Sequence, residues 1–177
     1  MAVAIIWQYE SGDAIPGDVQ DLGEVAAGAN STGLVMFGHF ETDVSVTLLT
    51  DVGFYIGPYD GIYTGDYSAL KDYYDLLAFG DIHRGSTNNR GFLINQSGYE
   101  VPAFPATDWE SCHSEQGSNP DNAIPLKKEA CEPNADNDGE LALGSVCKIK
   151  AMVSLPSLTR ETGIRQISMY MTFSYTI

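Results

Sequence analysis

The chain has 177 residues, of which 44% are hydrophobic and 19% charged, so we expect one globular domain rather than a disordered chain or a coiled coil. Carboxylates outnumber basic side chains 24 to 9, and the net charge is −15. Because such a chain is repelled by phosphate backbones and by anionic lipid, we expect neither a nucleic acid nor a membrane among its partners.

The negative charge is concentrated in the first part of the chain. Ten carboxylates precede Lys71, the first Lys or Arg of the chain. Such a distribution is typical of a solvated surface that keeps a protein soluble, which is the favoured interpretation. The alternative is a surface that docks on a basic partner.

The first predicted elements are strands. The run Ala2–Trp7 is short and lacks a basic flank, so we interpret it as a strand rather than as a signal peptide or a membrane span. Leu34–Phe40 is an apolar run bounded by glycines, which is typical of a strand buried on both sides. In Asp43–Thr50 the residues alternate between two faces, with Val44, Val46 and Leu48 opposite Ser45, Thr47 and Leu49.

A tyrosine-rich segment follows, interleaved with glycines and Pro58. Its six tyrosines are Tyr55, Tyr59, Tyr63, Tyr67, Tyr73 and Tyr74. Three interpretations stay open: the rings pack onto their own domain, they anchor a protein interface, or they stack on sugar rings. Because Gly57–Tyr67 would expose more backbone and aromatic surface than a monomer needs, we predict that it contacts neighbouring subunits.

One segment has helical rather than strand periodicity. In Ser68–Phe79, apolar residues recur at helical spacing, Ser68 is suited to cap the first turn, and Gly80 stands at the position that ends a helix. A single helix of about three turns would then lie between two groups of strands.

The next strand is predicted at Phe92–Asn95, and a different kind of segment follows it. Pro105–Gly139 is rich in Pro, Asn and Asp and poor in large apolar residues, so we predict a long loop that contacts neighbouring subunits. Within it, Asn134–Gly139 matches the first half of a calcium-binding EF-hand loop. Ser145 stands where that motif needs a glutamate, and an ordinary turn is the favoured interpretation.

Two alternating segments complete the pattern. Cys147–Met152 and Ile167–Tyr175 both alternate with a period of two, the second as far as the last residues given. The predicted fold is therefore mostly β: an antiparallel β-sandwich with one short α-helix and a long loop, forming a single domain over residues 1–177 with the extended loop at about 105–139.

The chemistry-bearing residues form no recognisable active site. The cysteines, Cys112, Cys131 and Cys147, have the spacing of neither a zinc finger nor a disulfide scaffold, so we expect free thiols. The histidines, His39, His83 and His113, open no catalytic motif, and His39 is interpreted as a packed or strand-surface residue. No phosphate-binding loop, dinucleotide fingerprint or nucleophile elbow occurs. We therefore expect no enzyme, no catalytic residue, no cofactor and no metal.

Three segments carry a resemblance to a known group of proteins. Asp21-Leu-Gly-Glu-Val-Ala-Ala-Gly28 resembles the opening of β-sandwich modules in virion proteins of tailed bacteriophages. Tyr67–Tyr73 with Gly80-Asp81, and Leu155–Ser157 with Thr162–Gln166 and Ser174–Ile177, are similar to parts of small phage structural proteins. The resemblance covers most of the chain in order.

The resemblance implies a structural protein present in many copies and without an active site. It would belong to the tail, the baseplate or the fibre-attachment region, or it would decorate the capsid. Its partners would be other virion proteins and copies of itself, and it would be made in the host cytoplasm and end in the virion. A sugar-binding or receptor-binding β-sandwich module is the alternative, supported by the tyrosine-rich segment.

Overall fold

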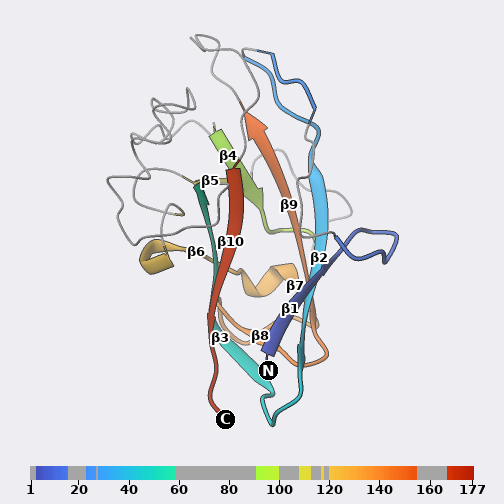
Figure 1. Ribbon diagram of the computed structural model, residues 1–177, viewed down its shortest axis with the longest axis vertical. Coiled ribbons are helices and arrows are strands. Elements are labelled where there is room, and N and C mark those ends of the chain that lie inside the picture. The colour runs from blue at the N-terminus through green and yellow to red at the C-terminus, as the bar shows by residue number, and fades with distance from the viewer. Residues whose placement is uncertain are drawn as a thin grey trace.

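The protein is described by a computed structural model that covers residues 3–15, 23–26, 28–58, 91–99, 108–112, 117, 120–154 and 167–177. Strands make up 53% of these residues and helical turns 6% (Figure 1). All strand pairs among the described residues are antiparallel. The predicted mostly β, antiparallel fold is confirmed.

The first sheet has six strands. Its order is β1 (Val3–Gln8), β2 (Leu34–Thr42), β9 (Val146–Ser154), β4 (Gly91–Asn95) and β5 (Trp109–Cys112), and β7 (Cys131–Glu132) pairs with the start of β9. The strands predicted at 34–40, 92–95 and 147–152 are present. β4 is buried on both faces, because Leu93 and Ile94 point to opposite sides and both are inaccessible to solvent.

The second sheet has four strands and is organised around β3 (Leu48–Pro58). β10 (Ile167–Ser174) lies along one side of β3. On the other side, β8 (Leu141–Ala142) pairs with the first residues of β3 and β6 (Ile124–Pro125) with its middle. The alternation predicted for the last segment is confirmed, since Met169, Met171 and Phe173 of β10 pack against the core.

One buried cluster joins the two sheets. Phe40 of β2 and Ile149 of β9 contribute to it from the first sheet, and Leu49 and Ile56 of β3 from the second. A contact across the sandwich is made by Trp7 of β1 with a phenylalanine of β3, Phe54, at 6.0 Å between ring centroids. The predicted packing of two sheets around one core therefore describes the fold.

A β-bulge near the start of β3 decides which of its residues face the core. Thr172 pairs with Gly53 and Ser174 pairs with Thr50, so β3 has one residue more than β10 in this interval. Asp51 takes up the extra length with a φ of 53°, in the left-handed region. Because one extra residue reverses the alternation, the core side chain before the bulge is Leu49, whereas Leu48 points away from the core.

The predicted strand over 43–50 is therefore corrected. β3 begins only at Leu48, and residues 43–47 form a turn that carries the chain from the first sheet to the second. The hydroxyl of Thr42 accepts a hydrogen bond from the Val44 N–H at 3.1 Å and donates one to the Val44 carbonyl at 3.1 Å. Such local bonds compete with strand pairing, which explains why alternation alone misplaced the strand.

A row of four residues crosses the inner face of the first sheet. Trp7 pairs with Gly38, Gly38 pairs with Cys147, and Cys147 pairs with Cys131. A Cβ placed on Gly38 would lie 2.7 Å from Cζ3 of Trp7 and 2.9 Å from the sulfur of Cys147. The glycine therefore provides the space into which the indole packs.

The predicted long loop at 105–139 is also corrected, for the part of it that the structure describes. This part contains β5, β6, β7 and two short 3-10 helices, η1 (Pro120–Asn122) and η2 (Lys128–Ala130). Ile124, Leu126 and Cys131 are completely buried. These residues are part of the sandwich core rather than an extended arm.

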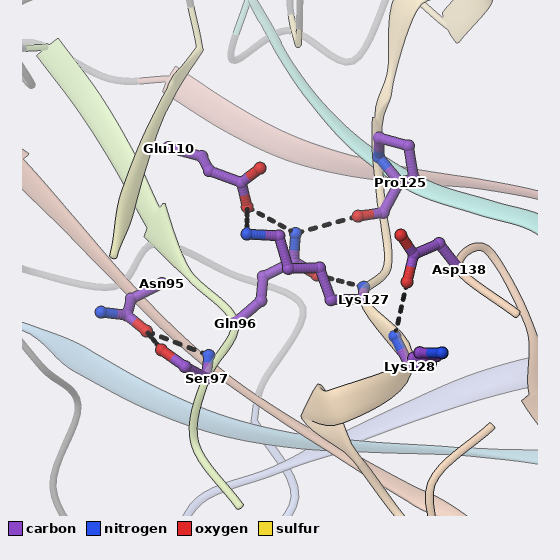
Figure 2. A network of polar contacts seen from close by, with 8 residues as sticks. All are labelled: Asn95, Gln96, Ser97, Glu110, Pro125, Lys127, Lys128 and Asp138. Atoms are coloured by element: carbon purple, nitrogen blue, oxygen red, sulfur yellow. Dashed lines mark hydrogen bonds and ion pairs between the residues drawn. The ribbon is translucent and has the colours of Figure 1, made fainter. Parts of the chain in front are cut away.

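A polar network holds this segment against the edge of the first sheet (Figure 2). Gln96, with 1% of its surface exposed, follows β4 and uses its whole amide group. Its nitrogen donates to Glu110 Oε2 at 3.0 Å and to the Pro125 carbonyl at 2.9 Å, and its oxygen accepts from the Lys127 N–H at 3.0 Å. The Lys127 ammonium also lies 3.2 Å from the Glu110 carboxylate. The segment after β6 is therefore linked to β5 in two ways, through Gln96 and through this ion pair.

The predicted helix at Ser68–Phe79 lies outside the described residues, as does most of the tyrosine-rich segment.

Candidate interaction surface

Large apolar side chains are exposed at one end of the second sheet. Among the described residues these are Leu48 with 38% of its surface exposed, Tyr175 with 40%, Leu143 with 49% and Ile177 with 78%. They come from the start of β3, from the residue after β8 and from the residues after β10, which gather at the same end of the molecule in Figure 1. We call these four residues the apolar end.

The strand pairing explains why these side chains lie together. β3 is the middle strand at this end, with Leu48 opposite Ala142 of β8 on one side and Thr50 opposite Ser174 of β10 on the other. The N–H of Leu143 donates to the Thr47 carbonyl at 2.8 Å, which fixes the residue after β8 beside the start of β3. The two leucines of the apolar end therefore lie on hydrogen-bonded backbone, and Tyr175 and Ile177 follow directly after β10.

An open pocket of about 190 Å³ lies within the apolar end. Leu48 and Tyr175 line it, together with four hydroxyl-bearing residues, Ser45, Thr47, Thr50 and Thr176. The ring of Tyr175 stacks on that of Phe173 at 6.4 Å between centroids. The pocket thus combines a supported aromatic ring with hydroxyl groups that can donate or accept hydrogen bonds.

The segments that form the apolar end carry negative charge only. Residues 42–51, 140–145 and 172–177 contain no Lys or Arg but three carboxylates, Asp43, Asp51 and Glu140. Asp43 and Asp51 are exposed and bracket the pocket-lining residues of the 45–50 segment. The carboxylate of Glu140 accepts two hydrogen bonds from Asn137, one from its side-chain amide at 2.9 Å and one from its backbone N–H at 3.0 Å.

The three cysteines are free thiols in the core, as predicted. Burial raises the pKa of the Cys131 and Cys147 thiols to about 12, with smaller contributions from the charges of Glu129 and of the neighbouring cysteine. Burial also raises the pKa of Cys112, helped by Glu110. A thiol reacts as its thiolate, so these residues are unreactive at neutral pH and do not form a nucleophilic site.

The histidines and the Asn134–Gly139 segment form no site together with the cysteines in the described part of the chain. His39 lies partly exposed on β2, with its Nε2 3.6 Å from Glu41, and His83 and His113 lie outside the described residues. Asn134–Gly139 forms a turn in which Asp138 accepts the Lys128 N–H at 3.0 Å. No group of three or more His, Cys, Asp or Glu side chains in the described part of the chain could hold a metal ion.

One tyrosine of the tyrosine-rich segment is described in side-chain detail. Tyr55 is 9% exposed, and its ring stacks on that of Tyr170 at 5.1 Å between centroids. A ring covered in this way cannot stack on a sugar. Tyr55 therefore matches the interpretation that tyrosines of this segment pack onto their own domain.

The exposed residues of the apolar end were not identified from the sequence. The alternation in 43–50 groups Leu48 with Val44 and Val46, and the bulge at Asp51, which makes Leu49 the buried residue instead, has no clear sequence signature. The pair Leu48-Leu49 is a signal of such exposure in the sequence. Two adjacent residues of a strand face opposite sides, so one of the two leucines is exposed unless both faces of the strand are covered.

Comparison of the chain with protein-family models, with curated proteins and with solved structures finds no match. In the part of the chain that the structure describes, no helix is long and apolar enough to cross a membrane.

Proposed function

We propose that this protein is a non-enzymatic structural component of a tailed-phage virion, located in the tail, baseplate or fibre-attachment region or decorating the capsid, and that its apolar end contacts another virion subunit. The sequence segments that resemble phage structural proteins support the virion assignment. The observation that supports the assembly role is the gathering of the exposed side chains of Leu48, Leu143 and Tyr175 at one end of the second sheet.

A protein-binding role fits this surface better than a catalytic one. Exposed apolar side chains grouped on hydrogen-bonded backbone are typical of protein interfaces, and aromatic residues such as Tyr175 are enriched among the residues that contribute most to binding. A subunit presented in many copies also needs a preformed contact surface, because ordering a loop on binding costs free energy.

The direct test is whether the protein is a stoichiometric part of purified particles. Virions from the source of this sequence, banded on a density gradient, should contain the chain by quantitative mass spectrometry. The double variant Leu48→Ser/Tyr175→Ser should be lost from the particles while remaining folded by circular dichroism.

A matched control is Val35→Ser, which removes a partly exposed apolar side chain near the far end of β2. This variant should be incorporated normally. Absence of the wild-type chain from particles would disprove the virion role, and normal incorporation of Leu48→Ser/Tyr175→Ser would disprove the role of the apolar end. Binding of the isolated protein to a glycan array, lost on Tyr175→Ser, would instead favour the sugar-binding or receptor-binding alternative.

A further inference from the structure

We infer that the apolar end binds a segment of a different protein in which apolar side chains alternate with or are flanked by lysine or arginine, and that it does not bind a second copy of this chain. The inference specifies the partner of the surface described above, and it rests on the proposed function to the extent that both assign a contact to this surface.

The apolar half of the recognition comes from the three neighbouring strand ends. Leu48 and Tyr175 line the pocket, and Leu143, which follows β8 on the other side of β3, is a further exposed apolar residue at this end. Each retains between 38% and 49% of its surface in contact with solvent. A partner that covers them removes apolar area from water, which favours apolar side chains on the partner.

The basic half of the recognition comes from charge complementarity. Asp43 and Asp51 stand at the two ends of the segment that lines the pocket, and no lysine or arginine lies on the segments that form the apolar end. They belong to the first seventy residues, which contain ten carboxylates and no Lys or Arg. A cationic partner is therefore attracted to this end, and the attraction is strongest at low ionic strength.

The same charges disfavour a second copy. A symmetric dimer places identical surfaces against each other, so Asp43, Asp51 and Glu140 of one copy would face the same three carboxylates of the other. Like charges brought together at an interface weaken association, and these segments contain no Lys or Arg that could face the carboxylates of the other copy. The bases that lie on the first sheet, Lys148 and Lys150, are on β9 rather than on the apolar end.

The inference is tested with the intact protein and three short synthetic peptides. In the first peptide Leu and Lys alternate, in the second Glu replaces Lys, and in the third Ser replaces Leu. We expect the Leu–Lys peptide to bind about tenfold more tightly than the Ser–Lys peptide, and the Leu–Glu peptide not to bind. Isothermal titration calorimetry at two salt concentrations measures these affinities.

Two isosteric double variants show whether the attraction is local. Asp43→Asn/Asp51→Asn should weaken binding of the Leu–Lys peptide by about tenfold, which is the size expected for two exposed ion pairs. The control Glu10→Gln/Glu24→Gln removes the same net charge from exposed residues outside the segments that form the apolar end, and it should change the affinity by less than about twofold. Asn also tolerates the left-handed backbone of Asp51.

The place of binding is read by carbodiimide cross-linking, which joins a carboxylate to a lysine amine as an amide while the carbodiimide takes up the lost water as a urea. Peptide cross-links should map to Asp43 or Asp51. Equal binding of the Leu–Lys and Ser–Lys peptides, or equal effects of the two double variants, would show general attraction to an acidic protein and overturn the inference. So would a dimer in sedimentation experiments that Leu48→Ser dissociates.

The peptide experiment and the particle experiment fail independently. If particles contain the protein but the peptides do not discriminate, the virion role stands and the basic partner is wrong. If the Leu–Lys peptide binds at the apolar end but particles lack the protein, the partner chemistry stands and the virion role is wrong.

Discussion

The Gln96 network and the apolar end both lie where short segments join strands. They differ in which side chains are buried: a polar one is buried in the network, and apolar ones are exposed at the apolar end. In the first, the polar side chain of Gln96 is buried, because both its amide nitrogen and its amide oxygen have hydrogen-bond partners. In the second, the side chains of Leu48 and Leu143 stay exposed although their backbone is hydrogen-bonded to a neighbouring segment. The comparison shows that a polar side chain can be buried in this fold when its hydrogen bonds are satisfied, and that apolar character alone does not bury a side chain at a sheet end.

The largest loss of stability is expected for a substitution that breaks the buried Gln96 network. Gln96→Glu keeps the size of the side chain but replaces the two N–H donors to Glu110 and Pro125 by an acceptor. Two acceptors then lose their donor and a charge is placed beside a carboxylate, so the free energy of unfolding should fall by about 3 kcal/mol in urea denaturation.

Gln8→Glu is the matched control, because it makes the same chemical change on a partly exposed side chain of β1. It should change the free energy of unfolding by less than about 0.5 kcal/mol. Equal losses in the two variants would mean that the Gln96 amide does not hold the segment after β6.

The stability of the protein should respond almost as strongly to a change in the row formed by Trp7, Gly38, Cys147 and Cys131. Gly38→Ala introduces a Cβ 2.7 Å from the indole of Trp7, and we expect a loss of about 2 kcal/mol from overpacking. In a Trp7→Leu background the same substitution should cost less, because the smaller side chain leaves room. A double-mutant cycle by urea denaturation measures this coupling, and additive effects would contradict the contact.

Alkaline pH tests the buried thiols. Burial raises the pKa of Cys131 and Cys147 to about 12 in the folded protein, whereas in the unfolded chain these thiols ionise near their ordinary pKa. The folded state therefore holds more protons above about pH 9, and stability should fall as the pH rises towards 12, by about 1.4 kcal/mol per unit and per thiol.

The contribution of one thiol is isolated in the Cys147→Ala variant, whose unfolding free energy should decrease less steeply over this pH range. An unchanged slope would mean that the thiol ionises equally in both states. A thiol reagent at neutral pH should modify all three cysteines in denaturant and react slowly with the native protein.

The smallest loss of stability is expected for a substitution at the apolar end. Leu48→Ser should reduce the free energy of unfolding by about 0.5 kcal/mol, because a large part of the side chain is already in water. A loss as large as that of Gln96→Glu, measured under the same conditions, would make Leu48 a core residue and remove the basis for the interaction surface.

The sequence was informative where local pattern and long-range packing agree. β9 and β10 follow a period of two, and the expectation of a mostly β antiparallel fold rested on such segments. The 43–50 segment shows the same period, but the bulge at Asp51 and the hydroxyl of Thr42 are tertiary and local backbone effects that alternation does not report.

The burial of the segment predicted as a loop could not be inferred for a similar reason. Its hydrogen-bond partner, Gln96, lies 29 residues from Pro125 and 31 from Lys127 along the chain. Nothing in the local composition of 120–130 indicates such a partner. The apolar end depends in the same way on which strands flank β3, which sequence patterns do not specify.

The position of β9 in the first sheet has a consequence for biosynthesis. β9 lies between β2 and β4, and its Ala151 pairs with Leu34 on one side and Ile94 on the other. Until the ribosome has synthesised the residues from Val146 onwards, β2 and β4 lack the strand that joins them. β3 likewise lacks its partner β10 along one side. We therefore expect folding to be late, slow and dependent on chaperones that shield unpaired strand edges, as is common when partners are distant along the chain.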